Sequence, residues 1–104
     1  MRGEVYRLRR PREAVGHEQH GPRCAVVVQS SALDVLSTWI VAPTSSSAAP
    51  ATFRPQVVVD GRATLVMCEQ ATAVSHARLG DLVGYLRLDE MRRLDDALRL
   101  VLDL

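Results

Sequence analysis

A short segment near the N-terminus, flanked by glycines, carries the side chains of this chain that are best suited to acid–base chemistry. It reads Gly16-His17-Glu18-Gln19-His20-Gly21-Pro22-Arg23 and leads into an apolar run at residues 25–28. Imidazole and carboxylate groups can transfer protons, and a guanidinium supplies permanent positive charge. A reaction that moves protons around a phosphodiester and stabilises its growing charge needs these groups together. The segment therefore makes a nuclease the first hypothesis.

The distribution of charge along the chain supports this hypothesis, whereas the net charge does not. The formal net charge is only +1, so bulk electrostatics does not indicate an anionic partner. All 13 cationic residues are arginine, and six of them lie between Arg2 and Arg23 against three acids there. A GC-rich coding bias replaces lysine by arginine everywhere, but it does not explain this clustering. Because the guanidinium fork fits phosphate oxygens, the cluster favours a phosphate-bearing ligand.

Length and composition indicate one small domain spanning residues 1–104. With 104 residues, 47% of them hydrophobic, the chain can build one modest core, and oligomerisation would add stability. The longest apolar runs are too short to cross a bilayer, and the N-terminus has arginines without the apolar segment of a signal peptide. We therefore expect a cytoplasmic protein with no membrane partner.

The cysteines and the known cofactor motifs give no indication of a metal or cofactor. Cys24 and Cys68 form neither a C-x-x-C pair nor a metal-ligand spacing, and both lie in apolar segments, so we expect buried, reduced thiols. The sequence contains no glycine-rich phosphate loop, zinc signature or dinucleotide fingerprint. We therefore expect no metal and no cofactor.

The elements that position the N-terminal segment 16–23 are expected to be mainly β-strands. Valine and aromatic residues predict strands at residues 3–9, 23–30, 38–42, 53–59, 63–68, 73–75 and 82–86. We expect Pro43 to end the third strand and Pro55 to mark an edge strand. The Asp60-Gly61 pair predicts a tight hairpin that makes its two flanking strands antiparallel neighbours.

The segments between these strands predict loops, one helical turn and one helix. Polar and small residues predict loops at 13–22 and 44–51, the second of them mobile, and a bend at 75–81. One helical turn capped by Ser31 is expected at 31–36. Asp89 is expected to cap a terminal helix with one apolar face, formed by Met91, Leu94, Leu98, Val101 and Leu102. Short strands with one such helix favour a small barrel.

Several of these segments together resemble the MazF/PemK family of toxin endoribonucleases over essentially the full chain. The opening at residues 1–6 is similar to the start of the family's sequences, and the segment 16–23 is similar to its most specific signature. Weaker similarities follow in the same order along the chain: Ala42-Pro43-Thr44-Ser45-Ser46, Cys68-Glu69-Gln70, and Arg78-Leu79-Gly80 with the tail to Leu104.

The resemblance implies a mainly β, SH3-like small barrel with a C-terminal α-helix. It also implies a homodimer that binds single-stranded RNA and cuts it without a metal, together with a protein antitoxin that neutralises the toxin. In a metal-free cut the ribose 2′-hydroxyl attacks the phosphorus, which gives a 2′,3′-cyclic phosphate and a 5′-hydroxyl. The protein must then take one proton, donate another and stabilise the phosphorane charge.

By this resemblance Arg23 stabilises the phosphorane, although a structural pairing of Arg23 with Glu18 or a backbone carbonyl is the alternative. Glu18 matches a proposed general base and His17 matches a position where some relatives carry histidine, so either could take the proton; both could also be solvated loop residues. His20 has no such counterpart. Gln19 is expected to support the site or contact RNA.

Ser45 lies where most relatives have a threonine whose hydroxyl binds the scissile phosphate, and Thr44 would replace it if the alignment slips by one residue. Glu69 and Gln70 match supporting positions, for which a structural hydrogen-bond network is an equal interpretation. Cys24 replaces a usual proline, which frees a backbone N–H. Met67 and Thr72 stand where some relatives have arginines, so the missing charge comes from Arg7, Arg9 or Arg54, or is not replaced, in which case the chain is a slow or inactive homologue.

Two other classes of function are compatible with this sequence. One is a toxin of the same barrel type that poisons DNA gyrase by protein contact, and the other is a catalytically silent module that binds only an antitoxin. Proton-transfer groups beside a phosphate-binding cation argue against both. The RNA motif is left open, because single-stranded readout depends on stacking surfaces, for which only Tyr6, Trp39, Phe53 and Tyr85 are available.

Overall fold

The computed structural model describes residues 1–9 and 23–104. Its seven strands are β1 (Glu4–Leu8), β2 (Arg23–Val27), β3 (Thr38–Ser45), β4 (Gln56–Val59), β5 (Arg62–Val66), β6 (Thr72–Ser75) and β7 (Leu79–Tyr85). Three short 3₁₀ helices, η1 (Ser31–Leu33), η2 (Cys68–Gln70) and η3 (His76–Arg78), connect strands, and α1 (Leu88–Leu102) follows the last strand. None of the helices in these described ranges has the length and apolar character needed to cross a membrane.

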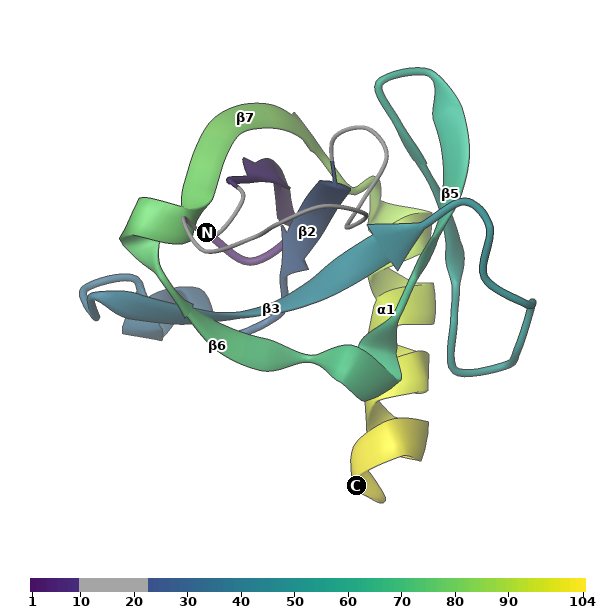
Figure 1. The fold of residues 1–104 in the computed structure, drawn as a ribbon. Helices are drawn as coiled ribbons and strands as arrows, with labels where there is room; N and C mark the ends of the chain where they lie inside the picture. Colours follow the sequence, from purple (N-terminus) through teal and green to yellow (C-terminus); the bar gives the residue numbers. More distant parts are fainter. Residues whose placement is uncertain (10–22) are drawn as a thin grey trace.

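The strands form one strongly curled, antiparallel sheet in the order β4-β5-β3-β2-β1-β7, and β6 pairs with β3. Figure 1 shows β7 arching over the N-terminal strands while α1 lies along one side of the sheet. The expected mainly β fold with a C-terminal helix is confirmed, as a curled sheet that forms half a barrel. The Asp60-Gly61 hairpin is confirmed too, because β4 and β5 pair antiparallel from Val59 opposite Arg62.

Both faces of the central strand β2 are buried, which explains its run of apolar residues. Val26 packs with Val5, Val66 and Leu94 of α1 in the larger core, whereas Ala25 and Val27 pack with Trp39 and Val41 in a second cluster. Alternate residues of a strand face opposite sides, so a strand between two clusters is apolar throughout. The expected apolar face of the helix is confirmed, since Leu94 is fully buried and Met91, Leu98 and Val101 pack around this core.

Pro43 does not end the third strand, contrary to expectation, because β3 continues to Ser45. On one side β3 pairs with β6 up to Val41 and with β5 from Thr44 onward, so Pro43 lies between these two partner strands. Its carbonyl accepts the Met67 N–H at 2.8 Å on that side. The missing N–H of Pro43 is therefore not needed there, and the proline is compatible with the strand.

Other boundaries were also predicted imperfectly. Residues 53–55 precede β4, Cys68 begins η2 instead of ending β5, and β7 begins at Leu79 inside the expected bend. Ser30, rather than Ser31, caps η1 through its hydroxyl, which accepts the Ala32 N–H. The N-cap of α1 is Arg87 rather than Asp89, because Arg87 has the extended backbone of a cap and its N–H is bound by Glu90.

The first turns of α1 hold the edge strand β4 through two side chains. The buried Glu90 carboxylate accepts the Arg87 N–H and the Val58 N–H, each at 2.8 Å, and Arg93 donates to the Gln56 carbonyl at 2.9 Å. The carbonyl of Pro55 accepts from Val66 of β5, so Gln56 and Val58 direct their backbone groups outward. The helix thereby satisfies backbone groups that the edge would otherwise expose.

Candidate functional site

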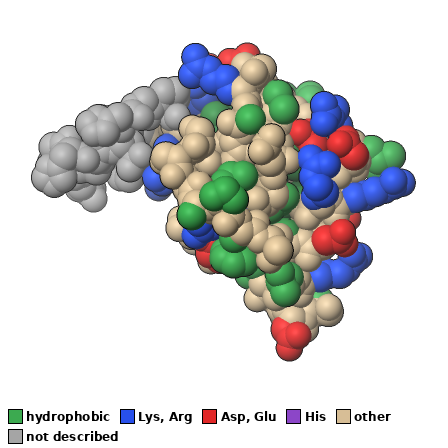
Figure 2. All heavy atoms as spheres, turned by 90° about the vertical axis from the view of Figure 1, so that its right-hand side faces the viewer, with side chains coloured by type: hydrophobic (Ala, Val, Ile, Leu, Met, Phe, Trp, Pro, Cys, Tyr) green, Lys and Arg blue, Asp and Glu red, His purple; other side chains and the backbone are tan. Residues whose placement is uncertain are grey.

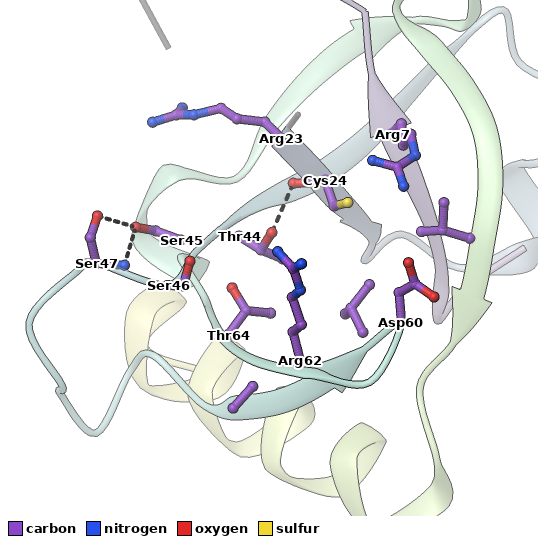
Figure 3. A pocket seen from close by; sticks show the side chains of 13 residues that line it. Arg7, Arg23, Cys24, Thr44, Ser45, Ser46, Ser47, Asp60, Arg62 and Thr64 are labelled. Carbon is purple, nitrogen blue, oxygen red and sulfur yellow. Dashed lines mark hydrogen bonds between the residues drawn. The ribbon is translucent and has the colours of Figure 1, made fainter. Parts of the chain in front are cut away.

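A pocket of about 650 Å³ opens between the N-terminal strands, the end of β3 and the β4–β5 hairpin. Figure 3 shows its lining residues, with Arg23, Thr44 and Arg62 among those labelled. The other lining side chains are Arg7, Cys24, Ser45, Ser46, Ser47, Val59, Asp60, Ala63, Thr64 and Val83. The pocket is therefore polar, with guanidinium and hydroxyl groups dominating its charged and hydrogen-bonding surface.

Among residues 1–9 and 23–104, three arginines and a single carboxylate line the pocket. Arg7 comes from β1, Arg23 from the start of β2 and Arg62 from the start of β5, whereas Asp60 belongs to the hairpin turn. In Figure 3 the Arg23 side chain extends toward the side that Ser45 and Ser47 line, and Arg7 and Arg62 lie on the side of Cys24 and Asp60. Such a concentration of guanidinium groups suits a ligand that carries phosphate groups.

The two neighbouring hydroxyl residues of β3 differ in how their side chains are used. Thr44 is 8% exposed and its hydroxyl donates to the Cys24 carbonyl at 3.3 Å, so that proton is already engaged. The half-buried Ser45 hydroxyl accepts the N–H groups of Ser47 and Ala48, at 3.3 and 3.1 Å, and contacts the Ser47 hydroxyl at 3.4 Å. Ser45 therefore has an oriented hydroxyl that can donate its proton into the pocket.

The structure brings only some of the expected site residues together. Arg23, Thr44, Ser45 and Arg7 all line the one pocket. His17, Glu18, Gln19 and His20 lie outside the described residues. Arg9, Arg54, Glu69 and Gln70 are described, but they are absent from the described residues that line this pocket.

Arg54 and Glu69 form an ion pair outside the pocket. The Arg54 guanidinium donates to Glu69 Oε2 at 2.6 and 3.1 Å and to the Ala49 carbonyl at 2.9 Å, and it lies 5.3 Å from the centre of the Phe53 ring. The hydrogen bond from Arg54 lowers the pKa of the Glu69 carboxyl below its usual 4.5. These contacts tie the segment between β3 and β4 to η2. The loop predicted at 44–51 is thus held by specific hydrogen bonds, and its first two residues, Thr44 and Ser45, belong to β3.

Arg62 is a pocket residue that the sequence interpretation missed. The turn residues Asp60 and Gly61 have φ of 52° and 78°, the geometry of a tight hairpin with both central residues in the left-handed region. This turn places Arg62 opposite Val59 at the rim of the pocket. The Asp60-Gly61 signal predicted the hairpin, but no local pattern indicated which loop the hairpin would face. Met67 and Thr72, the positions at which some relatives carry arginines, do not line the pocket in the described structure: Met67 is 8% exposed, and Thr72 pairs with Val41.

The aromatic residues considered for base stacking do not line the pocket. Tyr6 and Trp39 pack edge to face with ring centres 6.1 Å apart, and Trp39 packs against His76 at 4.3 Å. Burial and a hydrogen bond to Glu4 raise the pKa of Tyr6 to about 12. Arg54 covers the Phe53 ring. Tyr85 is 62% exposed, outside the pocket. Within the described chain, no aromatic ring forms a stacking surface in the pocket.

Both cysteines are free, but only Cys68 is buried as expected. Burial, reinforced by the charge of Glu69, raises the pKa of the Cys68 thiol to about 11. Cys24 is half-buried in the pocket lining; burial also raises the pKa of its thiol, and the Arg7 guanidinium opposes that shift. Among residues 1–9 and 23–104, no group of three or more His, Cys, Asp and Glu side chains is arranged to hold a metal ion.

Comparison with known proteins gives concordant matches along nearly the whole chain. The family of the PemK-like, MazF-like toxin of type II toxin–antitoxin system matches residues 1–102. A candidate toxin of Mycobacterium tuberculosis is 39% identical over 98 residues, which cover 93% of this chain and 92% of that protein.

Solved structures show the same fold at low sequence identity. An endoribonuclease from a mycobacterial species, solved in complex with its cognate antitoxin, superposes with a TM-score of 0.81 at 18% identity, covering 100% of this chain and 95% of the other. MazF from Deinococcus radiodurans superposes with a TM-score of 0.77 at 21% identity, covering 99% and 96%. With the sequence matches, this chain belongs to the PemK/MazF family of type II toxin–antitoxin toxins, whose known activity is that of endoribonucleases.

Proposed function

We propose that this chain cleaves single-stranded RNA in the arginine-lined pocket, without a metal ion, by attack of the ribose 2′-hydroxyl. The observation that carries the proposal is the placement of Arg23 and the Ser45 hydroxyl in one open pocket. A guanidinium and a hydroxyl can together bind the oxygens of one phosphodiester. Family membership supplies the reaction type, and the pocket supplies groups of the right chemistry to support it.

In this mechanism the 2′-hydroxyl attacks the phosphorus, the P–O5′ bond breaks, and the products are a 2′,3′-cyclic phosphate and a 5′-hydroxyl. Arg23 stabilises the negative charge that develops on the phosphorane, and Ser45 donates a hydrogen bond to one of its oxygens. Glu18 or His17, in the segment that leads to Arg23, takes the 2′-hydroxyl proton, and the leaving 5′-oxygen takes a proton from the other of these two groups or from water, which gives the 5′-hydroxyl. Thr44 supports the site through its hydrogen bond to the Cys24 carbonyl.

The partners of the proposed toxin are single-stranded RNA, a protein antitoxin and a second copy of the chain. The antitoxin follows from the type II toxin–antitoxin family, and a mycobacterial structural relative was solved with its cognate antitoxin. We further propose that residues 1–104 act as one domain in the cytoplasm. The homodimer follows from the family and from the small core of a chain this short.

The test is incubation of the purified protein with end-labelled RNA in the presence of a chelator, beside a DNA gyrase supercoiling assay. RNA fragments with 2′,3′-cyclic phosphate ends support the proposal, and a substrate with 2′-deoxyribose at the cleaved position should resist. Intact RNA with inhibited gyrase would overturn it in favour of a gyrase poison. Intact RNA with active gyrase would overturn it in favour of a module that binds only an antitoxin.

A further inference from the structure

Most arginines of the described chain are engaged in contacts that restrict or neutralise their side chains. Hydrogen bonds or ion pairs to carboxylates or backbone carbonyls are made by Arg2, Arg54, Arg78, Arg87, Arg93 and Arg99. Within residues 1–9 and 23–104, Arg7 and Arg62 have no ion pair or side-chain hydrogen bond to such a group, and both line the pocket. Arg9 and Arg92 likewise have none in these described ranges, but neither lines the pocket. Arg7 and Arg62 are therefore two arginines without a counter-charge that face the space where a ligand would bind.

The two guanidinium groups approach the pocket from separate elements, Arg7 from β1 and Arg62 from the hairpin, and among the described residues Asp60 is the only carboxylate in the lining. In Figure 3 Arg7 lies on the side away from Ser45, and Arg62 points into the middle of the view, between Thr44 and Asp60. One phosphate bound at Arg23 and Ser45 would leave both groups without an anion. Two like charges that face one cavity favour the binding of a second anionic group between them.

We propose that Arg7 and Arg62 form a second phosphate-binding position, which holds the RNA phosphate next to the scissile one. This inference rests on the proposed function, because it assigns the ligand of the same pocket. The Asp60 carboxylate repels a phosphate group, so we expect the phosphate to bind close to the two guanidinium groups and away from Asp60.

The base of Arg62 is held firmly enough for such a role. The hairpin turn at Asp60 and Gly61 fixes the start of β5, and Glu90 and Arg93 of α1 hold the adjacent strand β4 by its outward backbone groups. A guanidinium mounted on a constrained hairpin loses less conformational freedom on binding than one on an unconstrained loop. The position is therefore prepared before RNA binds.

The experiment compares wild type with Arg62→Gln and Arg7→Gln, and uses Arg92→Gln as the matched control. Arg92 is exposed on α1 and does not line the pocket. The probes are a fluorescein-labelled RNA oligonucleotide that spans a mapped cleavage site, and the same oligonucleotide with 2′-deoxyribose at the scissile position, which permits binding without cleavage. Thermal melting checks that each variant is folded.

We expect Arg62→Gln and Arg7→Gln to raise Kd for the uncleavable probe and KM for the cleavable one by roughly 10-fold, while kcat changes less than about 3-fold. Loss of one phosphate contact should reduce the slope of log Kd against log salt concentration by about 0.7. Arg92→Gln should leave the slope unchanged. A loss of stability alone would not alter this slope for the folded protein.

A probe with an uncharged methylphosphonate at the adjacent phosphate completes a double-mutant cycle. The modification should weaken binding to wild type roughly 10-fold, the single-contact effect expected from the substitution, and should weaken binding to Arg62→Gln hardly at all. Equal weakening in both proteins, or an unchanged salt slope in Arg62→Gln, would overturn the second position. Weakened binding of an acidic antitoxin peptide with unaltered RNA binding would also overturn it.

The two proposals can fail separately. If wild type binds the uncleavable probe and Arg62→Gln shows the reduced salt slope while no RNA is ever cut, the phosphate-binding position stands and the proposed ribonuclease reaction is wrong. If wild type cuts RNA with the expected ends and Arg62→Gln behaves as wild type, the reaction stands and the second position is wrong.

Discussion

Thr44 and Ser45 show how a single step along a strand separates a structural hydroxyl from one that can act on a ligand. Both residues line the pocket, but Thr44 is buried and its hydroxyl donates to the Cys24 carbonyl, whereas Ser45 is half-buried and its hydroxyl accepts from the turn that follows. Two backbone N–H groups orient the Ser45 oxygen, so its proton is the one available to a phosphate oxygen. The geometry therefore favours Ser45 over Thr44 for the phosphate-binding role.

Replacement of Arg23 by alanine should reduce the rate of RNA cleavage at least ~100-fold, because one donor to the transition state is lost. The side chain is exposed, so the midpoint of thermal unfolding should stay close to that of wild type. Single-turnover cleavage of a labelled oligonucleotide measures the effect. Arg92→Ala, a change at an exposed arginine on α1, is the control and should cleave normally. Near-normal cleavage by Arg23→Ala would defeat the assignment.

The two thiols should differ in reactivity, and Cys24 should report on occupancy of the pocket. Cys68 is 1% exposed with a pKa of about 11, so iodoacetamide at pH 8 should leave it unmodified in the native protein. Cys24, half-buried in the pocket, should react slowly, and more slowly still with an uncleavable oligonucleotide bound. Peptide mass spectrometry measures both sites, with guanidinium-unfolded protein as the fully reactive control. Protection of Cys68 alone by the oligonucleotide would contradict this placement.

At the scale of elements, the ion pair of Arg54 and Glu69 connects the segment after β3 to the short helix η2. A supporting role was expected for both residues, with a structural hydrogen-bond network as the equal interpretation for Glu69, and here the Arg54 guanidinium binds Glu69 and the Ala49 carbonyl. The segment that it holds begins with the Ser45 turn, in which Ser47 and Ala48 bind the Ser45 hydroxyl. The pair is therefore a candidate for positioning Ser45 from outside the pocket.

Replacement of Glu69 by glutamine should reduce the free energy of unfolding by about 1 kcal/mol near neutral pH, the size of a well-formed pair near the surface. Arg54 lowers the pKa of the Glu69 carboxyl in the folded state, so its stabilisation is present above the unfolded value near 4.5 and is lost as the pH falls through the lower folded pKa. Urea denaturation at several pH values should show wild type and variant converging in acid. Asp96→Asn, in a highly exposed pair with Arg99, is the control and should show little difference throughout. A difference that is constant with pH would contradict the ion-pair explanation.

The elements that the sequence predicted well are those whose signals are local. The Asp60-Gly61 turn and the apolar face of α1 depend on residues close in the chain, and both are confirmed. Pro43 was misread because its tolerance depends on two strands, β5 and β6, that come much later in the sequence. Asp89 was misread as a cap because the backbone of Arg87, which a side-chain pattern does not reveal, sets the start of the helix.

At the scale of the whole molecule, charge is distributed unevenly despite a net charge of +1. Figure 2 shows arginine and acidic side chains alternating along the right-hand side of the face that it presents, while the centre of that face is mainly apolar or uncharged. Ion pairs such as those of Asp89 with Arg87 and Arg93 neutralise the surface of α1, whereas the pocket keeps three arginines against Asp60. The N-terminal arginine cluster predicted two of these arginines, Arg7 and Arg23. Arg62 is distant in sequence, and it reaches the same pocket because the sheet is curled.

The chain should be a dimer in solution at micromolar concentration. Several large apolar residues remain exposed on the single chain, among them Leu100, Leu102 and Leu104 at the end of α1, at 58%, 60% and 84%. A second copy that covers such residues would add to a small core. Sedimentation equilibrium should give twice the chain mass of 11.5 kDa, and the same measurement in denaturant gives the monomer reference. A species of 11.5 kDa alone at micromolar concentration would contradict the dimer.

The hold of α1 on β4 has a consequence for how this sheet can be extended by other chains. The outward N–H of Val58 and the outward carbonyl of Gln56 are bound by Glu90 and Arg93. A strand of another chain that paired with the edge strand β4 could therefore not form hydrogen bonds with these two groups. To add there, it would first have to break the contacts of a buried carboxylate, leaving that charge unsatisfied. We therefore expect α1 to oppose the growth of fibres and the binding of an extended peptide along β4 in the native state.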